Sequence, residues 1–153
     1  MPPAASIHTD IESPIETLHA TTVAIGGRAV MLHGPSGVGK SDLALRLIDR
    51  GATLVSDDYT VVRREGDRAI ASPPPTIAGR IEVRGVGIIA LPHLENAPVA
   101  LLLDLDGEVE RMPPEPLTRP VAGVEVPIMT IAPREPSAPI KVEMALRAHG
   151  LVR

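Results

Sequence analysis

Cysteine, tryptophan and phenylalanine are absent from this 153-residue sequence, and tyrosine occurs only once. Without cysteine there can be no disulfides, no thiol chemistry and no thiolate zinc site. With almost no aromatic rings the core must be aliphatic, and stacking-type binding of single-stranded nucleic acid is disfavoured. A net charge of -4 gives no long-range attraction to nucleic-acid phosphates or anionic lipids. Any anion-binding site must therefore be local.

Long hydrophobic runs are also missing: no stretch approaches the roughly 18 apolar residues that a membrane-spanning helix needs. Residues 1–17 contain no basic segment followed by an apolar run, so an export signal is not predicted. They are polar and proline-bearing, and we expect them to form a flexible tail. Residues 18–153 have the length of one ordinary domain, and we expect that domain to be cytoplasmic.

Lysine is scarce, because 13 of the 15 basic residues are arginine and only Lys40 and Lys141 are lysine. A lysine kept in such an arginine-biased chain indicates a place where a compact ammonium is needed and a planar guanidinium would not serve. Lys40 is therefore the first residue for which we seek a functional role.

Strand patterns dominate the chain, and only two segments have helical spacing. Strands are predicted at 21–25, 29–32, 53–55, 61–62, 69–71, 99–105 and 125–131, with turns at 26–27 and 65–67 and helices at 41–50 and 140–149. The proline-rich segments 72–75 and 113–120 are predicted to be loops. The fold class is α/β, with a mixed, strand-rich sheet and few helices.

A phosphate-binding loop is the strongest pattern in the sequence. Residues 34–41 read G-P-S-G-V-G-K-S, which satisfies G-x-x-x-x-G-K-[ST] between a predicted strand and a predicted helix. Glycines let the backbone wrap a phosphate, and the loop amides and helix N-terminus supply partial positive charge. Lys40 is expected to reach the β- and γ-phosphates, and the Ser41 hydroxyl to bind Mg²⁺. The nucleotide-binding residues are Gly34, Pro35, Ser36, Gly37, Val38, Gly39, Lys40 and Ser41.

An acidic pair, Asp57 and Asp58, follows the strand predicted at 53–55. We expect a parallel strand there to deliver the pair beside the phosphate loop. One carboxylate near Mg²⁺ and one near the γ-phosphate would suit metal positioning and proton abstraction from a hydroxyl. The alternative is an ordinary acidic turn after a strand.

Further segments of the chain resemble one protein family. His19, the phosphate loop, R-G-A-T-L-V-S-D-D at 50–58 and I-E-V-R-G-V-G-I-I at 81–89 occur in that order. Together they resemble the catalytic domain of bacterial HPr kinase/phosphorylase. The resemblance is continuous over about 19–90 and patchy beyond. It implies a nucleotide-binding fold related to that of phosphoenolpyruvate carboxykinase.

The resemblance implies an ATP- and Mg²⁺-dependent kinase that phosphorylates a serine of the phosphocarrier HPr, or of its nitrogen-system relative. The family also removes this phosphate by phosphorolysis, which yields pyrophosphate. By position, Asp58 matches the general base, and Ser41 and Glu82 match the Mg²⁺ ligands. Lys40 and His19 match active-site residues, and Arg111 matches the family's later catalytic arginine. Arg84, two residues from Glu82, is expected to share its strand face and offset phosphate charge.

Two departures from the family pattern bear on function. Usual members carry a separate N-terminal domain, so this sequence resembles the short, catalytic-domain-only form of some proteobacteria. Segment 132–137 matches the family's phosphorolysis-linked loop only loosely. By resemblance we also expect a homo-oligomer, a hexamer in the family. The alternatives are a phosphate-loop kinase of a small metabolite and a non-catalytic nucleotide-binding sensor. Neither nucleic acid nor a membrane is an expected partner.

Overall fold

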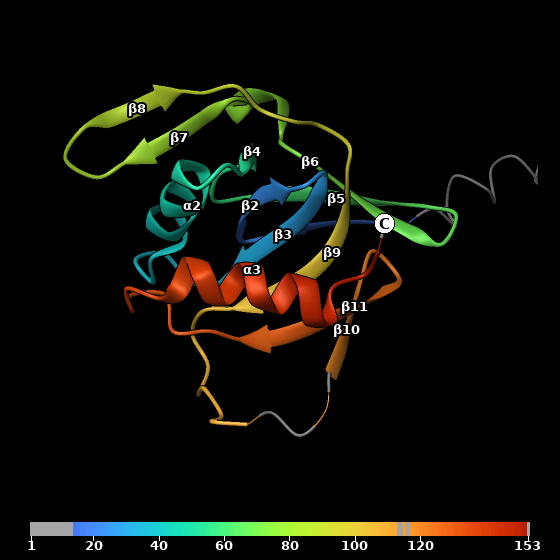
Figure 1. Ribbon diagram of the computed structural model, residues 1–153. Helices are drawn as coiled ribbons and strands as arrows, with labels where there is room; N and C mark the ends of the chain where they lie inside the picture. Colours follow the sequence, from blue (N-terminus) through green and yellow to red (C-terminus); the bar gives the residue numbers. More distant parts are fainter. Residues whose placement is uncertain (1–13, 113–114, 116, 153) are drawn as a thin grey trace, which may run out of the picture.

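The computed structural model describes residues 14–112, 115 and 117–152. Within this part of the chain, most strands form one nine-stranded sheet (Figure 1). Its members are β1 (Ile15–Leu18), β2 (Ala20–Ile25), β3 (Arg28–His33), β4 (Thr53–Ser56), β5 (Thr60–Glu65), β6 (Arg68–Ser72), β9 (Ala97–Asp104), β10 (Leu117–Val121) and β11 (Val124–Thr130). Outside it are the hairpin of β7 (Arg80–Val83) and β8 (Gly87–Ala90), the helices α2 (Lys40–Asp49) and α3 (Ala138–His149), and the 3-10 turn η1 (Pro75–Ile77).

The sheet divides at β9. The order is β1-β5-β6-β9-β3-β2-β4, and β11 pairs in parallel with the C-terminal half of β9, where Leu102 lies opposite Ile128. At its N-terminal end β9 pairs antiparallel with β6, through Ala97 and Pro98. On its other side β9 is parallel to β3. Because β3, β9 and β11 are parallel, their carboxyl ends meet at one edge of the sheet, and the loops that follow them lie there.

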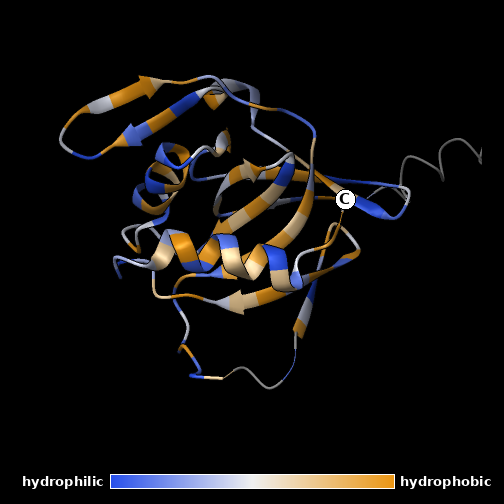
Figure 2. Ribbon diagram, in the orientation of Figure 1, coloured by the Kyte–Doolittle hydropathy of each residue, from blue (hydrophilic) through white to orange (hydrophobic). Residues whose placement is uncertain are grey.

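Both faces of the central strands are buried. Val30 and Leu32 of β3 pack into a core with the apolar sides of α2 and α3, whereas Met31 packs into a second core on the other face. Figure 2 shows the matching apolar colour along β3 and β9. Burial on both faces explains the uninterrupted apolar run of β9, which does not alternate with polar residues.

Two turns follow directly from the sequence. Gly26 and Gly27 join β2 to β3, and both have a positive φ, +59° and +83°. A two-residue hairpin turn that matches strand twist requires this conformation, and glycine adopts it without a Cβ clash. The turn predicted at 65–67 joins β5 to β6. Both predicted helices are present, as α2 and α3.

The two helices are joined by an ion pair at the molecular surface. The guanidinium of Arg50 donates to both carboxylate oxygens of Glu143, at 2.9 and 2.7 Å. This hydrogen bonding lowers the pKa of Glu143 and raises that of Arg50. The contact fixes the C-terminal end of α2 against α3.

Several sequence expectations were wrong in their bounds. Ile15–Thr17 are not tail but part of β1, which pairs antiparallel with β5; residues 1–13 lie outside the described residues. The predicted loop 113–120 ends in a strand, because β10 includes Pro120. Among the described strands β10 pairs with β11 alone, and an edge strand tolerates a residue without an N–H. Similarly, loop 72–75 begins in β6 and ends in η1.

The strand before the acidic pair has the predicted direction but a different neighbour. β4 pairs antiparallel with β2, which is itself antiparallel to β3. β4 therefore runs in the same direction as β3 without touching it, and both strands end at the same edge. No helix in the described residues has the length and apolar character to cross a membrane.

We expect Leu103→Ala to reduce the free energy of unfolding by about 2–5 kcal/mol. Leu103 is fully buried in β9, so the truncation leaves a cavity under the helices. Met144→Ala, on the exposed side of α3, is the control and should change stability by about 0.5 kcal/mol or less. Urea unfolding followed by circular dichroism measures both; equal losses would contradict the assigned core.

Candidate active site

The phosphate loop connects the buried end of β3 to the first turn of α2. Its glycines adopt conformations that other residues rarely do, with φ of +85° at Gly37 and +113° at Gly39. A Cβ built on Gly37 would meet no atom within 4 Å, so the backbone there faces open space that a ligand can fill. Gly39 is the N-cap of α2 and accepts the first helical hydrogen bond from Leu43. The loop is thus shaped as an anion cradle at a helix N-terminus.

Lys40 is almost completely buried, with 5% of its surface exposed. Its ammonium donates to the carbonyl of Pro35, at 3.0 Å, and lies 3.6 Å from Oδ1 of Asp58. A buried ammonium needs such partners, since desolvation without them is costly. The positive charge is therefore held inside the phosphate loop, facing the acidic pair.

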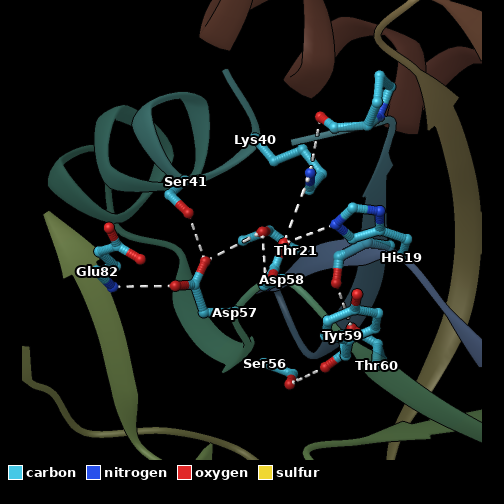
Figure 3. A network of polar contacts seen from close by, with 12 residues as sticks. His19, Thr21, Lys40, Ser41, Ser56, Asp57, Asp58, Tyr59, Thr60 and Glu82 are labelled. Atoms are coloured by element: carbon cyan, nitrogen blue, oxygen red, sulfur yellow. Dashed lines mark hydrogen bonds and ion pairs between the residues drawn. The ribbon is translucent and has the colours of Figure 1, made fainter. Parts of the chain in front are cut away.

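Asp57 connects three parts of the chain. Its Oδ1 accepts hydrogen bonds from Ser41, at 2.5 Å, and from Thr21, at 3.1 Å, while its Oδ2 accepts one from the backbone N–H of Glu82, at 2.9 Å (Figure 3). Only 7% of the residue is exposed. The carboxylate thereby fixes the start of α2, strand β2 and strand β7 around one point.

Asp58 is held in an unusual backbone conformation. Its φ is +67°, and the N–H of Tyr59 donates to the carbonyl of Asp57, at 2.7 Å, across this tight turn. The N–H of Asp58 donates to Thr21, at 2.9 Å. Such strained conformations persist where the surroundings hold them, and they concentrate at functional sites. The turn points the carboxylate, 49% exposed, away from Asp57 and toward Lys40 and His19.

His19, in the bend between β1 and β2, contacts Asp58 directly. Its Nε2 lies 2.8 Å from Oδ1 of Asp58, and an ionised carboxylate only accepts, so the ring donates. The ring stacks on Tyr59 with centroids 4.8 Å apart and planes 12° from parallel. The carbonyl of His19 also accepts from Gly34, the first residue of the phosphate loop. Both ring and backbone of His19 are therefore fixed relative to that loop.

A second histidine, His33, lies at the end of β3 near this group. Burial lowers its pKa, and the charge of Arg119 lowers it further. His33 is consequently neutral at pH 7 and adds no positive charge to the site.

One cavity of about 550 Å³ is lined by Lys40, Asp57 and Asp58, and His19 contacts it through Asp58. Three cationic side chains line it, and so do four carboxylates. The cations are Lys40, Arg84 and Arg134, and the carboxylates are those of Asp42, Asp57, Asp58 and Glu82. Leu45 and Val83 provide aliphatic wall. The cavity combines an anion cradle with oxygen donors suited to a divalent cation.

The donor set fits Mg²⁺, which prefers hard oxygen ligands and keeps several waters. Ser41, Asp57 and Glu82 supply a hydroxyl and two carboxylates at the cavity wall. No group of three His, Cys, Asp or Glu side chains is placed to hold a metal among the residues that the structure describes. A cation bound here would therefore rely on few protein ligands, with phosphate oxygens and water completing its shell.

The structure brings together most of the residues that the sequence indicated. His19, Lys40, Ser41, Asp58 and Glu82 meet at this cavity or in direct contact with its lining. Arg111 does not: it is exposed in the loop after β9, away from the cavity lining, and its catalytic role stays a prediction.

Two residues at the site were missed. Thr21 bonds both aspartates, and its pattern offered one clue, a polar pair inside an otherwise apolar strand. Arg134 reaches the cavity from the loop after β11, and the one signal for it was the loose match of segment 132–137 to the family's phosphorolysis-linked loop.

Comparisons with known proteins identify relatives of this chain. HPr kinase/phosphorylase from Exiguobacterium is 36% identical over 135 residues, which cover 80% of this chain and 43% of the relative. That from Chlorobium phaeobacteroides is 34% identical over 132 residues, covering 78% of this chain and 39% of the relative. The chain thus spans less than half the length of these relatives.

A solved structure is similar over nearly its whole length. The Hpr(Ser) kinase/phosphatase of Coxiella burnetii superposes with a TM-score of 0.75 at 31% identity, covering 88% of this chain and 90% of that one. The family model of the HPr Serine kinase C-terminal domain matches residues 12–96, which include the phosphate loop, both aspartates and β7. The chain therefore belongs to the family of HPr Serine kinase C-terminal domains.

Proposed function

We propose that this protein uses ATP and Mg²⁺ to phosphorylate a serine of an HPr-type phosphocarrier, either HPr or its nitrogen-system relative. The observation that carries the proposal is the position of Asp58. Its half-exposed carboxylate lies 3.6 Å from the phosphate-loop lysine and 2.8 Å from His19, in the cavity that also holds the candidate magnesium ligands. A base beside a phosphate cradle is the arrangement that phosphoryl transfer to a hydroxyl requires.

Binding is the task of the phosphate loop and the oxygen donors. The loop amides and Lys40 would hold the phosphates, and Ser41, Asp57 and Glu82 would hold the cation directly or through water. Bound Mg²⁺ would neutralise phosphate charge and orient the transferred group. Asp57 accepts one of its three hydrogen bonds from the Ser41 hydroxyl. It therefore also holds that hydroxyl in the position from which it would bind the cation.

Proton transfer is the task of Asp58. It accepts the proton of the substrate serine while the serine oxygen bonds to the γ-phosphorus and the bond to the ADP oxygen breaks. His19 and Lys40 both contact Oδ1 of the Asp58 carboxylate, and these contacts orient it toward the reacting hydroxyl. The Lys40 ammonium stabilises charge on the transferred group.

The same residues would serve phosphorolysis. An oxygen of inorganic phosphate attacks the phosphoserine phosphorus, the serine oxygen leaves and takes a proton from Asp58, and pyrophosphate is formed. The general base of one direction is thus the general acid of the other.

The HPr-type partner is supported by the names of the relatives and by access to the site. Tyr59 is 46% exposed and stacks on His19, so a protein carrying the serine can approach Asp58 along this side of the cavity. Homo-oligomer formation is likewise proposed from family membership.

We expect Asp58→Asn to lower serine phosphorylation of HPr by about a hundredfold or more, because the amide keeps the shape but cannot accept the proton. Incubation with ATP, Mg²⁺ and the organism's own HPr, followed by mass spectrometry of HPr, measures it. Glu125→Asn, an exposed change in β11, is the control and should retain wild-type activity.

Three outcomes would contradict the proposal. Wild-type protein that leaves HPr unmodified excludes the protein-kinase activity. Phosphorylation of a metabolite without HPr would instead support a small-molecule kinase. Tight ATP binding with neither transfer nor hydrolysis would support a nucleotide sensor.

The magnesium ligands can be tested by cation titration. We expect Ser41→Ala and Glu82→Gln each to raise the Mg²⁺ concentration at half-maximal rate by about tenfold, since the first removes an oxygen donor and the second replaces a carboxylate by a neutral amide oxygen in a site with few ligands. Glu125→Gln removes a carboxylate outside the cavity and should leave the Mg²⁺ requirement unchanged. An unchanged requirement in both site variants would show that they do not bind the cation.

Base selectivity is expected to be weak. Among the described residues no aromatic ring lines the cavity, whose apolar wall is Leu45 and Val83, and aliphatic contact discriminates poorly between purines. Initial rates with GTP and with ATP should therefore differ by less than about a hundredfold. A larger preference for ATP would require base-specific hydrogen bonds that this cavity wall does not explain.

A further inference from the structure

The loop between β11 and α3, residues 131–137, lies directly against the phosphate loop (Figure 1). A Cβ built on Gly39 would come within 3.6 Å of the Cβ of Pro133, so the two loops touch at the glycine that caps α2. The segment follows the carboxyl end of a parallel strand, the edge where the phosphate loop also begins. It therefore forms a wall of the nucleotide site contributed by the far end of the chain.

Arg134 projects from this wall to the phosphate loop. Its guanidinium donates to the carbonyl of Gly37, at 2.7 Å, and the side chain lines the cavity together with Lys40 and Arg84. A carbonyl is a neutral partner, and a guanidinium binds a phosphate oxygen more strongly because both groups are charged. Arg134 is thus placed to exchange the Gly37 carbonyl for a phosphate of the bound nucleotide.

Arg46 of α2 binds the backbone of loop 131–137. Its guanidinium donates to the carbonyls of Pro133 and of Glu135, the residues on either side of Arg134. Asp42, one helical turn earlier, accepts from Nε of Arg46 at 3.1 Å and fixes its orientation. The planar fork of arginine suits this use, because separate N–H groups reach three oxygens at once. Arg46 itself does not line the cavity; it is connected to it through the loop that carries Arg134 and through Asp42, a residue of the lining.

We propose that Arg46 is a positioning residue which clamps loop 131–137 onto the phosphate loop, so that Arg134 binds a phosphate group of the nucleotide. The proposal rests on the proposed nucleotide-binding function and deepens it. Arg134 contacts the ligand, and Arg46 acts through Arg134. The hydrogen bonds of Arg46 join α2 to a loop almost 90 residues later in the chain. They therefore couple the position of Arg134 at the cavity to the packing of the C-terminal segment.

Equilibrium binding of Mg²⁺–ATP, measured without HPr and at fixed salt, tests the proposal independently of catalysis. We expect Arg134→Ala to weaken binding by about tenfold, as loss of one charge-assisted contact predicts. Arg46→Ala should weaken it by about threefold to tenfold. The double variant should bind no more weakly than Arg134→Ala alone, because Arg46 acts through Arg134.

Two matched variants separate positioning from charge and from helix stability. Arg50→Ala removes a cation from the same helix but breaks only the bond to Glu143 of α3, and it should leave binding unchanged. Arg46→Lys keeps the charge but cannot reach both carbonyls and Asp42, so it should bind as weakly as Arg46→Ala.

The binding measurements test the positioning role, the phosphate contact and the proposed function separately. Additive losses in the double variant, wild-type binding by Arg46→Lys, or an equal loss in Arg50→Ala would overturn the positioning role. Unchanged binding by Arg134→Ala would overturn the phosphate contact. Wild-type protein that does not bind Mg²⁺–ATP at all would overturn the proposed function itself, whereas wild-type binding that Arg46→Ala leaves intact overturns this inference alone.

Discussion

The buried carboxylate of Asp57 organises the candidate active site. A desolvated anion is stable only where donors surround it, and here they come from the first turn of α2, from β2 and from the backbone of β7. These three elements come from separate parts of the chain, and the Asp57 carboxylate contacts all three. The requirement to satisfy one carboxylate therefore sets the spacing between the phosphate loop and the β7–β8 hairpin that carries Glu82.

The second aspartate depends on the first. β4 and β5 pair in one register with the successive strands β2 and β1, so the chain keeps its direction through residues 57–59, and Asp58 takes the positive φ at the kink between the two strands. Thr21 binds the Asp57 side chain and the Asp58 backbone at once, so one hydroxyl supports both. The two adjacent carboxylates consequently point to different partners, one to Ser41 and the backbone of Glu82 and the other to Lys40 and His19. Identical side chains obtain separate roles from the backbone between them.

Some secondary-structure elements could be predicted from the sequence and others could not. The G-x-x-x-x-G-K-S motif and its flanking apolar periods located β3, the loop and α2, because these are local patterns. The glycines at 26 and 27 located a hairpin for the same reason. β1 and β10 were missed because short edge strands with few buried residues carry weak patterns, and Pro120 indicated a loop where an edge strand tolerates it.

The sequence by itself determined the phosphate loop, its lysine, the acidic pair and family membership. Each of these depends on a short run of contiguous residues, so a local motif is enough to identify it. Only the tertiary structure decided which groups meet around them. The stack of His19 on Tyr59 and the hydrogen bond from Arg134 to Gly37 join residues 40 and 97 positions apart, and β2 lies between β3 and β4 although β4 comes after α2 in the chain. Such contacts follow from the packing of two cores on opposite faces of one sheet, and no local pattern encodes them.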